Sequence, residues 1–394
     1  MTIKFYKRTL TSFFLFIVLL VLSALIILPP MIDRNMNLVT DHLPFKVPKD
    51  VKEFHKTLII GDWHADSTLW NRNLIREYDY GHVDIPRLQR GNVAIQMFTT
   101  VTKSPAGQNY NRNETDARDN ITALAIVQRW PIKTWTSLFE RAVYQSDKIH
   151  ELALLDPNNF MLITSQQDIK ILLSRRLNNP EIIGGLIGTE GSHALDGELS
   201  NIEKLYDRGF RMMSLQHFFD NQLGGSLHGT SNMGLTEFGN KAILEMLRLK
   251  IIIDVSHSSE NVVKDVLKIT NKPIVVSHTG FDGYCKSPRN ISDSLMIEIA
   301  NKGGLIGVGF WDAAVCDNTP KAVAEAIFYG VGLIGADHIS LGSDFDGTIT
   351  PGFDTSELEA ITYELLKLGL SKPSIRKVMG GNMLKFLQQN LPEE

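Results

Sequence analysis

Eight short apolar runs are spaced along this chain, and each is followed by polar residues. The runs cover residues 58–63, 93–99, 185–189, 211–216, 251–256, 274–277, 305–310 and 339–342. Such continuous runs, without strict alternation, are typical of strands buried on both faces of a parallel sheet. Helical patterns lie between several of them, at 236–249, 292–302 and 320–334. Eight strands that alternate with helices favour an α/β fold, a closed (β/α)8 TIM barrel, over an open sheet.

The longest connection lies between the second and third runs, from residue 101 to residue 180. It contains Trp130 and Trp135, and its pattern predicts a helix at 132–154. Long connections at the carboxyl ends of barrel strands tend to build the rim of the active site. A second domain is possible in this segment but is not needed to explain it.

Histidine and carboxylate side chains stand where the runs end. His64 and Asp66 are two residues apart at the end of the first run. Because alternate residues of a strand point to the same side, both side chains can face the barrel mouth and hold one metal ion. Taken alone, such a pair is more often a hydrogen-bonded histidine beside a loop aspartate, so the other runs decide its meaning.

Two consecutive runs, the fifth and the sixth, each end in a serine followed by His257 or His278. Adjacent strands that each deliver an imidazole can supply a second metal ion. Glu190, at the end of the third run, is the natural carboxylate to bridge the two ions. Because buried charges must be paired or bound to metal, this ring of imidazoles and carboxylates predicts a metal site.

Three further residues are candidates for catalysis or substrate binding. His217 ends the fourth run and could be another ligand or a hydrogen-bond donor. Asp344 follows the eighth run and could bind metal or move protons; Asp346 is its rival, ranked second because Asp344 is nearer to the run. Arg289 follows the sixth run, where a guanidinium suits a substrate carboxylate, although a surface arginine would give the same pattern.

The amino terminus differs from the rest of the chain. Lys4, Lys7 and Arg8 precede an apolar stretch at 10–28, close to the roughly 20 residues that span a bilayer as a helix. A cleaved signal peptide is the alternative, but its apolar core is usually only roughly 7–15 residues long, and the cleavage-site match here is poor. We favour an uncleaved anchor, with the amino terminus in the cytoplasm and the remainder in the periplasm or extracellular space.

These patterns divide the chain into three segments. Residues 1–30 form the cytoplasmic flank and the transmembrane anchor. Residues 31–51 are mixed and polar, with Pro44 and Pro48 and no sustained period, and are interpreted as a tether. Residues 52–394 form the barrel.

Composition excludes some classes of function. The chain has a net charge of −4 over 394 residues, so it lacks the basic excess of nucleic-acid-binding proteins. Its only cysteines are Cys285 and Cys316. Two cysteines do not make a disulfide framework, and whether they form a single bridge stays open. A structural zinc site built from cysteines is not expected.

From about residue 58 to residue 387 the chain resembles the membrane dipeptidases, also called renal dipeptidases, of the amidohydrolase superfamily. The resemblance rests on seven segments that occur in the family order with similar spacing. They are His64-Ala65-Asp66, Thr189-Glu190-Gly191-Ser192-His193-Ala194-Leu195, Gly234-Leu235-Thr236, Ile253-Asp254-Val255-Ser256-His257, Val276-Ser277-His278-Thr279-Gly280, Arg289-Asn290 and Gly342-Ser343-Asp344-Phe345-Asp346-Gly347. Jointly these segments are very specific.

The resemblance implies two Zn²⁺ ions per subunit. By motif, His64 and Asp66 would bind one zinc ion. His257 and His278 would bind the other, and Glu190 would bridge both. A homodimer is implied by the resemblance only.

The resemblance also implies roles around the substrate, a dipeptide. His217 would contact the substrate and polarise the scissile carbonyl. Arg289 would hold the C-terminal carboxylate, and Asp344 would pass protons from the attacking water to the leaving amine. The expected activity is zinc-dependent hydrolysis of dipeptides, including those with a C-terminal D-residue, by attack of a zinc-bridging hydroxide.

Departures and rival interpretations remain. Ala65 and Ser192 stand where the family commonly has Asn and Gly; neither is a ligand, so the substrate preference is affected more than the metal site. The tail has no apolar segment for the lipid anchor of animal members. One alternative is another binuclear amidohydrolase, which a bridging lysine would have favoured. The other is a non-catalytic binding protein, which a lost ligand would have favoured.

Overall fold

Eight parallel strands close into a barrel, as the sequence predicted. The computed structural model describes the backbone of residues 2–394 and the side chains of residues 10–20 and 22–394. The barrel strands are β1 (Ile60–Ala65), β2 (Val93–Val101), β4 (Ile183–Glu190), β5 (Phe210–Ser214), β6 (Ile252–Asp254), β7 (Val275–Thr279), β8 (Leu305–Val308) and β9 (Ile339–Leu341). Their order is β2-β1-β9-β8-β7-β6-β5-β4, and pairing of β2 with β4 closes the ring. Every residue of these strands is buried, which explains the continuous apolar runs.

The long connection after β2 contains elements that the sequence did not fully predict. A short strand, β3 (Phe160–Leu162), pairs with the first half of β4. It has only three residues and two of them are half-buried, so no pattern marked it. The expected helix at 132–154 is divided into a 3₁₀ turn, η2 (Ile132–Trp135), and α5 (Leu138–Leu155). Ser137 starts the second helix by accepting a hydrogen bond from the Glu140 N–H, which is a standard N-cap.

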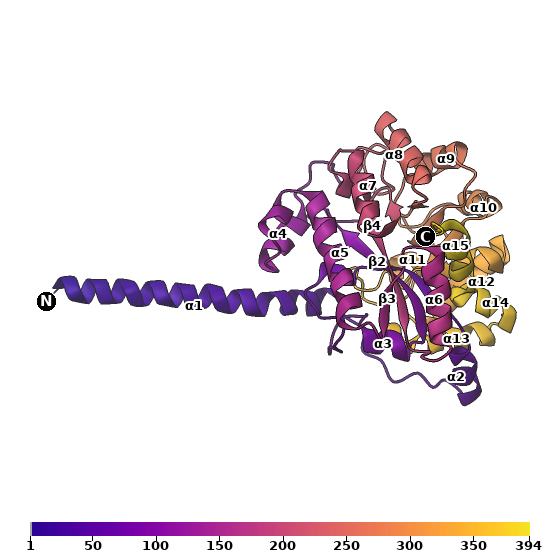
Figure 1. Cartoon of the computed structure of the whole chain (residues 1–394), viewed down its shortest axis with the longest axis horizontal. Helices are drawn as coiled ribbons and strands as arrows, with labels where there is room; N and C mark the ends of the chain where they lie inside the picture. Colours follow the sequence, from indigo (N-terminus) through magenta and orange to yellow (C-terminus); the bar gives the residue numbers. More distant parts are fainter. Residues whose placement is uncertain (1) are drawn as a thin grey trace.

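The remaining helices surround the barrel (Figure 1). They are α2 (Lys49–Lys56), α3 (Ile85–Arg90), α4 (Asn120–Val127), α6 (Gln166–Arg176), α7 (Ser200–Asp207), α8 (Glu237–Arg248), α9 (Glu260–Ile269), α10 (Asp293–Asn301), α11 (Asp312–Val315), α12 (Pro320–Ile334), α13 (Glu359–Lys367), α14 (Lys372–Arg376) and α15 (Asn382–Asn390). The predicted helices at 236–249, 292–302 and 320–334 correspond to α8, α10 and α12. Thr236 and Thr319 cap α8 and α12 through their side-chain oxygens.

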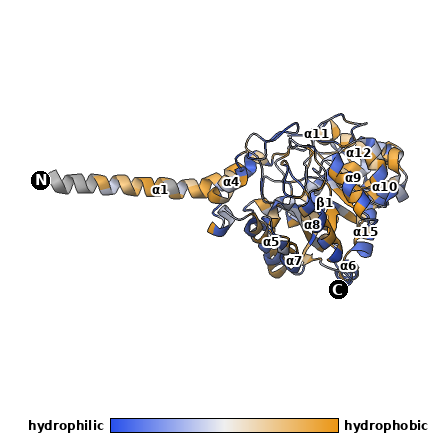
Figure 2. Cartoon of the chain, turned by 90° about the horizontal axis from the view of Figure 1, so that it is seen from above, coloured by the Kyte–Doolittle hydropathy of each residue, from blue (hydrophilic) through white to orange (hydrophobic). Residues whose placement is uncertain are grey.

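The first helix, α1 (Thr2–Met36), projects away from the barrel as a long rod (Figures 1 and 2). Pro29 and Pro30 lie inside this helix, which runs on to Met36. Residues 10–36 are long and apolar enough to cross a bilayer, judged by length and composition only. The side chains of Lys4, Lys7 and Arg8, on which the predicted orientation rests, lie outside the described residues.

The start of the expected tether is packed against the barrel. Asp33 is 2% exposed, and its Oδ2 accepts a hydrogen bond from Arg72 Nε at 2.9 Å. The Thr40 N–H donates to the Pro351 carbonyl at 2.9 Å. The segment after α1 therefore follows the barrel surface for at least its first residues.

Cys285 and Cys316 form a disulfide. Cys285 lies in the loop after β7, and Cys316 follows α11 in the loop after β8. The bridge that the sequence left open thus joins two neighbouring loops at the carboxyl end of the barrel.

Candidate metal centre

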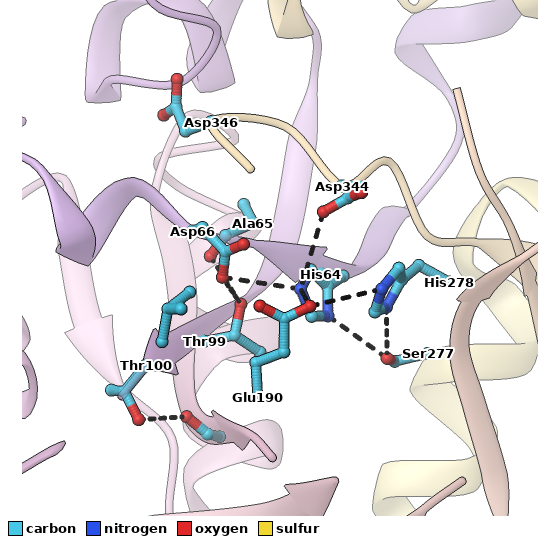
Figure 3. Close-up of polar contacts among 12 residues, drawn as sticks. His64, Ala65, Asp66, Thr99, Thr100, Glu190, Ser277, His278, Asp344 and Asp346 are labelled. Atoms are coloured by element: carbon cyan, nitrogen blue, oxygen red, sulfur yellow. Dashed lines mark hydrogen bonds and ion pairs between the residues drawn. The ribbon is translucent and has the colours of Figure 1, made fainter. Parts of the chain in front are cut away.

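The carboxyl ends of the barrel strands bring the predicted metal ligands together. His64 lies in β1 and Asp66 follows it; Glu190 is the last residue of β4; His278 lies in β7, and His257 follows β6. None of these side chains belongs to a residue more than 4% exposed. They form a buried cluster, of which Figure 3 shows His64, Asp66, Glu190 and His278.

Glu190 is the centre of this cluster. Its Oε1 lies 3.4 Å from His64 Nε2, 3.3 Å from His257 Nε2 and 3.4 Å from His278 Nε2. Its other oxygen, Oε2, lies 3.4 Å from His217 Nε2. One carboxylate therefore faces four imidazoles from four different strands or strand ends.

Two further carboxylates approach His64. Its Nε2 lies 3.5 Å from Asp66 Oδ1 and 3.9 Å from Asp344 Oδ1. Thr99 holds Asp66 in place by donating a hydrogen bond to its Oδ1 at 2.6 Å. His64, Glu190, His278 and Asp344 can all offer one ligand atom to a common point, as can Glu190, His217 and His257.

A serine sets the tautomers of two histidines. Ser277 Oγ donates to Asp254 Oδ2 at 2.7 Å. Since a hydroxyl has only one proton, its lone pairs must accept from the ring nitrogens beside it. These are Nδ1 of His278 at 2.9 Å and Nδ1 of His64 at 3.2 Å. Both rings then carry a lone pair on Nε2, the atom that faces Glu190, as metal-binding histidines require.

The pKa shifts in the cluster favour an ionised glutamate beside neutral histidines, which is the charge pattern of a cation site. Burial acts to raise the pKa of Glu190, but His217, His257 and His64 hold it well below its usual range. Burial and Arg289 hold the pKa of His257 well below its usual range, and burial with His64 does so for His278. Metal binding needs this combination of ionised carboxylate and neutral imidazole.

His64 shows that the cluster attracts positive charge. Burial opposes its protonation, but Asp66 and Glu190 raise its pKa well above the ordinary value. Its Nε2 is buried without a hydrogen-bond partner among the described residues. A metal cation would supply both the missing partner and the positive charge, so the residues fit a metal.

Arg289 lies beside the cluster and is 1% exposed. Its Nη2 donates to the His278 carbonyl at 2.7 Å and lies 3.5 Å from His257 Nε2. Among the described residues it has no carboxylate partner within salt-bridge distance. A buried guanidinium without an anion is costly, so this site favours a ligand with a negative charge.

The two rival aspartates occupy different surroundings. Asp344 faces the cluster, and burial raises its pKa well above the usual range. Asp346 points away from it (Figure 3): its carboxylate accepts from Ser67 Oγ at 2.6 Å and pairs with Arg72 Nη2 at 2.6 Å. Both residues have a positive φ of 63°. This conformation is unusual for aspartate and is common where a functional loop is tightly held.

A cavity of about 430 Å³ opens from the cluster. Asp66, Glu190, His217, His257, Arg289 and Asp344 line it. Sequence reasoning missed several other residues here. Tyr110 lines the cavity and accepts a hydrogen bond from Trp311 Nε1 at 3.1 Å. His228 stacks on Phe218 and lies 5.2 Å from the His257 ring, centroid to centroid. Both come from irregular loops, where no periodic pattern marks a position.

Comparison with known proteins identifies the relatives of this chain. A family model described as membrane dipeptidase, peptidase family M19, matches residues 49–392. The chain belongs to this family. It is a metallopeptidase of the dipeptidase type, and the cluster around Glu190 is the place in its structure where a metal fits.

Individual relatives of this M19 protein are distant. It is 27% identical to dipeptidase aclJ of Aspergillus oryzae, over 83% of this chain and 76% of that protein. It is 26% identical to dipeptidase ataJ of Aspergillus terreus, over 82% and 80% of the two chains. In both cases the match covers most of the relative.

Solved structures share the fold. The probable dipeptidase PvdM of Pseudomonas aeruginosa superposes with a TM-score of 0.70 at 21% identity, covering 87% of this chain and all of that chain (100%). A metallopeptidase of Rhodobacter sphaeroides, crystallised with a phosphinate mimic of the dipeptide L-Ala-D-Ala, superposes with a TM-score of 0.65 at 21% identity, covering 85% and 99%. At this identity the structures support the barrel fold alone.

Proposed function

We propose that this M19 protein is a dipeptidase that uses two zinc ions held by His64, Asp66, Glu190, His257 and His278. The spacing of donor atoms around Glu190 carries the proposal. Two atoms that each lie about 2.0–2.1 Å from a zinc ion at a tetrahedral angle are about 3.3 Å apart. The Nε2 atoms of His64, His257 and His278 lie 3.3–3.4 Å from Glu190 Oε1. These separations exceed usual N–H···O distances and leave room for ions between the donors.

The zinc ions, when bound, supply hydroxide near neutral pH and polarise the scissile carbonyl. The remaining steps belong to the side chains around them. His217 reaches into the cavity with its ring held by a hydrogen bond between Nδ1 and the Lys103 carbonyl, 3.0 Å. Because the carbonyl accepts, Nδ1 carries a proton, and Nε2 is a donor only when the ring is an imidazolium. In that form Nε2–H stabilises negative charge on the carbonyl oxygen, which is often the largest contribution to catalysis.

Asp344 moves the proton. It is buried beside His64 and lines the cavity, so its carboxylate can take a proton from the attacking water. Burial favours the protonated form of this carboxyl group, which then gives the proton to the leaving amine. Asp346, paired with Arg72, is held out of this role.

Arg289 selects the substrate. We propose that its guanidinium, buried without an anion among the described residues, binds the C-terminal carboxylate of a dipeptide. The Rhodobacter sphaeroides relative that was crystallised with an L-Ala-D-Ala mimic supports extending the substrates to a C-terminal D-residue.

The test is hydrolysis of L-Ala-D-Ala, L-Ala-L-Ala and N-acetylated L-Ala-L-Ala by the full chain in detergent. Cleavage of the free dipeptides should stop with a chelator and return when zinc is added. A Glu190→Gln variant should lose activity and bind less zinc, because the ligand shared by both ions loses its charge. Glu237→Gln, on the surface at the start of α8, is the matched control. Full turnover with full zinc content in Glu190→Gln would contradict the bridging role, and zinc-loaded wild-type protein that cleaves no dipeptide would point to another amide substrate.

We further propose that α1 is an uncleaved single-pass anchor, with the barrel in the periplasm or extracellular space. The length and apolar composition of residues 10–36 support the anchor. The Cys285–Cys316 disulfide supports the side, because such bridges persist in oxidising compartments and are rare in the cytosol.

A further inference from the structure

The cavity at the metal cluster has a second, apolar half. The cluster residues and Arg289 line one part of the cavity. Side chains from α1, from the loop after β1, and from α4 line another part. These are Ile32, Met36, Leu69, Trp70, Ile121, Leu124 and Val127. Ser104 and Gln108, from the connection between β2 and α4, and Asn120, the first residue of α4, also line the cavity.

The last turns of α1 are thus a wall of the candidate active site. Ile32 packs against a cluster of apolar side chains that includes Trp70, Ile121 and Trp130. Helices α1 and α4 are in contact, and both are largely apolar where α1 meets the barrel (Figure 2). The same helix that qualifies as a membrane span therefore ends inside the lining of the cavity.

This wall is fixed relative to the catalytic loop. Arg72 bridges Asp33 of α1, at 2.9 Å, and Asp346 of the β9 loop, at 2.6 Å. All three side chains are at most 3% exposed. The Thr348 N–H also donates to Asn37 Oδ1 at 3.3 Å. Asp346 and Thr348 lie two and four residues from Asp344, so the end of α1 and the proton-transfer residue are held together.

Strand order gives the direction in which a substrate would lie. Arg289 is in the loop after β7, whereas Leu69 and Trp70 follow β1 and α4 follows β2. In the barrel, β8 and β9 separate β7 from β1. A dipeptide whose carboxylate is bound by Arg289 must cross the metal cluster with its peptide bond. Its N-terminal residue then lies toward the apolar half.

We propose that the preferred substrates of this enzyme are dipeptides with a large apolar N-terminal residue, whose side chain lies between the end of α1 and α4. This inference rests on the proposed dipeptidase function. It makes the membrane helix a specificity element as well as an anchor. A single extra methylene in an apolar pocket changes kcat/KM by about 10-fold or more, so the preference should be large enough to measure.

The test compares Leu-Ala and Phe-Ala with Ala-Ala, using the full chain in detergent micelles and in vesicles. We expect kcat/KM for Leu-Ala or Phe-Ala to exceed that for Ala-Ala by about 10-fold or more. In the variants Ile32→Asn and Leu124→Asn this ratio should fall at least fivefold. Met31→Asn is the matched control, since Met31 is exposed on the same helix and does not line the cavity; it should leave the ratio unchanged.

The outcomes separate the two proposals. Failure to cleave any dipeptide would overturn the proposed function itself. Cleavage of Ala-Ala with no preference for Leu-Ala or Phe-Ala would overturn the apolar site and leave the dipeptidase intact. A preference that persists in both Ile32→Asn and Leu124→Asn would place the apolar pocket elsewhere. Absence of the preference in the wild-type panel is enough to overturn the inference, so the inference stays testable even if a variant does not fold.

Discussion

At the scale of single residues, the metal site depends on side chains that touch no metal. Ser277 is the main example, because one hydroxyl orients His64 and His278 and is itself held by Asp254. Such partners fix the ring orientation and the tautomer of a ligand. The ligands alone do not define the site.

Ser277→Ala should therefore weaken zinc binding by about 10–100-fold, the usual cost of losing a partner of a ligand. Both rings lose the acceptor for Nδ1–H and become free to bind in the wrong tautomer. Competition with a fluorescent zinc chelator would measure the affinity. Ser340→Ala is the control, since Ser340 is equally buried in β9 but its hydroxyl has no partner among the described residues. Equal affinities in the two variants would refute the orienting role.

The burial of His228 predicts that the stability of the protein depends on pH. Burial, aided by Arg289, lowers its pKa to about 3, whereas an unfolded histidine has a pKa of about 6.5. The unfolded state thus binds the proton first, and stability falls as the pH drops below 6.5. Between pH 6.5 and pH 5.5 this residue should cost about 1 kcal/mol of unfolding free energy.

His228→Asn should remove that loss, because asparagine keeps a donor for the Tyr110 carbonyl, now bonded to Nδ1 at 2.9 Å, but does not titrate. Urea unfolding of both proteins at pH 7.5, 6.5 and 5.5 would measure it. The difference between the two proteins should change with pH only below about pH 7. A constant difference would mean that His228 does not titrate on unfolding.

The residues that the sequence could predict are those placed by strand periodicity. His64, Glu190 and His278 are at or next to the last residue of a barrel strand. The end of an apolar run in the sequence therefore predicts their positions. Tyr110, which lines the cavity, and His228, whose ring packs on those of Phe218 and His257, come from irregular loops and reach the site only through tertiary packing. No local pattern could have indicated them.

At the scale of elements, the sequence predicted every barrel strand but not the docking of α1. Apolar runs predict these strands because a strand buried on both faces needs apolar residues at nearly every position. The docking depends on Asp33, a single carboxylate that finds Arg72 39 residues later in the chain. A polar stretch with two prolines gives no sign of such a partner, and it was interpreted as a tether.

Arg72→Met should destabilise the protein by about 3–5 kcal/mol, because it leaves the carboxylates of Asp33 and Asp346 buried without a cation. Denaturant unfolding of the detergent-solubilised chain would measure this. Arg34→Met is the matched control, because Arg34 follows Asp33 in α1 and also pairs with a carboxylate. Arg34 pairs with Asp79 at 2.7 Å, but these side chains are 50% and 74% exposed. Solvent screens such a pair, so the loss should be far smaller than in Arg72→Met. Similar losses of unfolding free energy in both variants would show that the buried ion pairs of Arg72 stabilise the protein no more than an exposed pair does.

At the scale of the whole molecule, the disulfide and the apolar helix report on the same question, the compartment of the barrel. The bridge joins the loop that carries Arg289 to the loop after β8. Neither feature alone fixes the compartment, but both are expected of a domain exported behind an anchor.

Two measurements check this. Protein exported with α1 should show no free thiol after denaturation, whereas a chain that lacks residues 1–30 and stays in the cytoplasm should show two. Replacing both cysteines with serine should lower the unfolding free energy by about 3–4 kcal/mol, the loop-closure value for residues 31 positions apart. Two free thiols in the exported protein would contradict the proposed compartment.

The bridge from Asp33 through Arg72 to Asp346 has a geometric consequence. A domain on a loose linker can tumble and present its opening to any direction. Here α1 and the loop beside the opening are joined through buried charges and turn as one body. With α1 in a membrane, as proposed, the opening would keep a fixed distance from the lipid surface and a fixed orientation toward it. Substrates could then approach it only from the side away from the lipid. A short peptide could still reach the opening along the membrane plane. A long chain would have to bend away from the lipid to enter. The membrane itself would therefore disfavour long substrates, in addition to any selection by the side chains of the site.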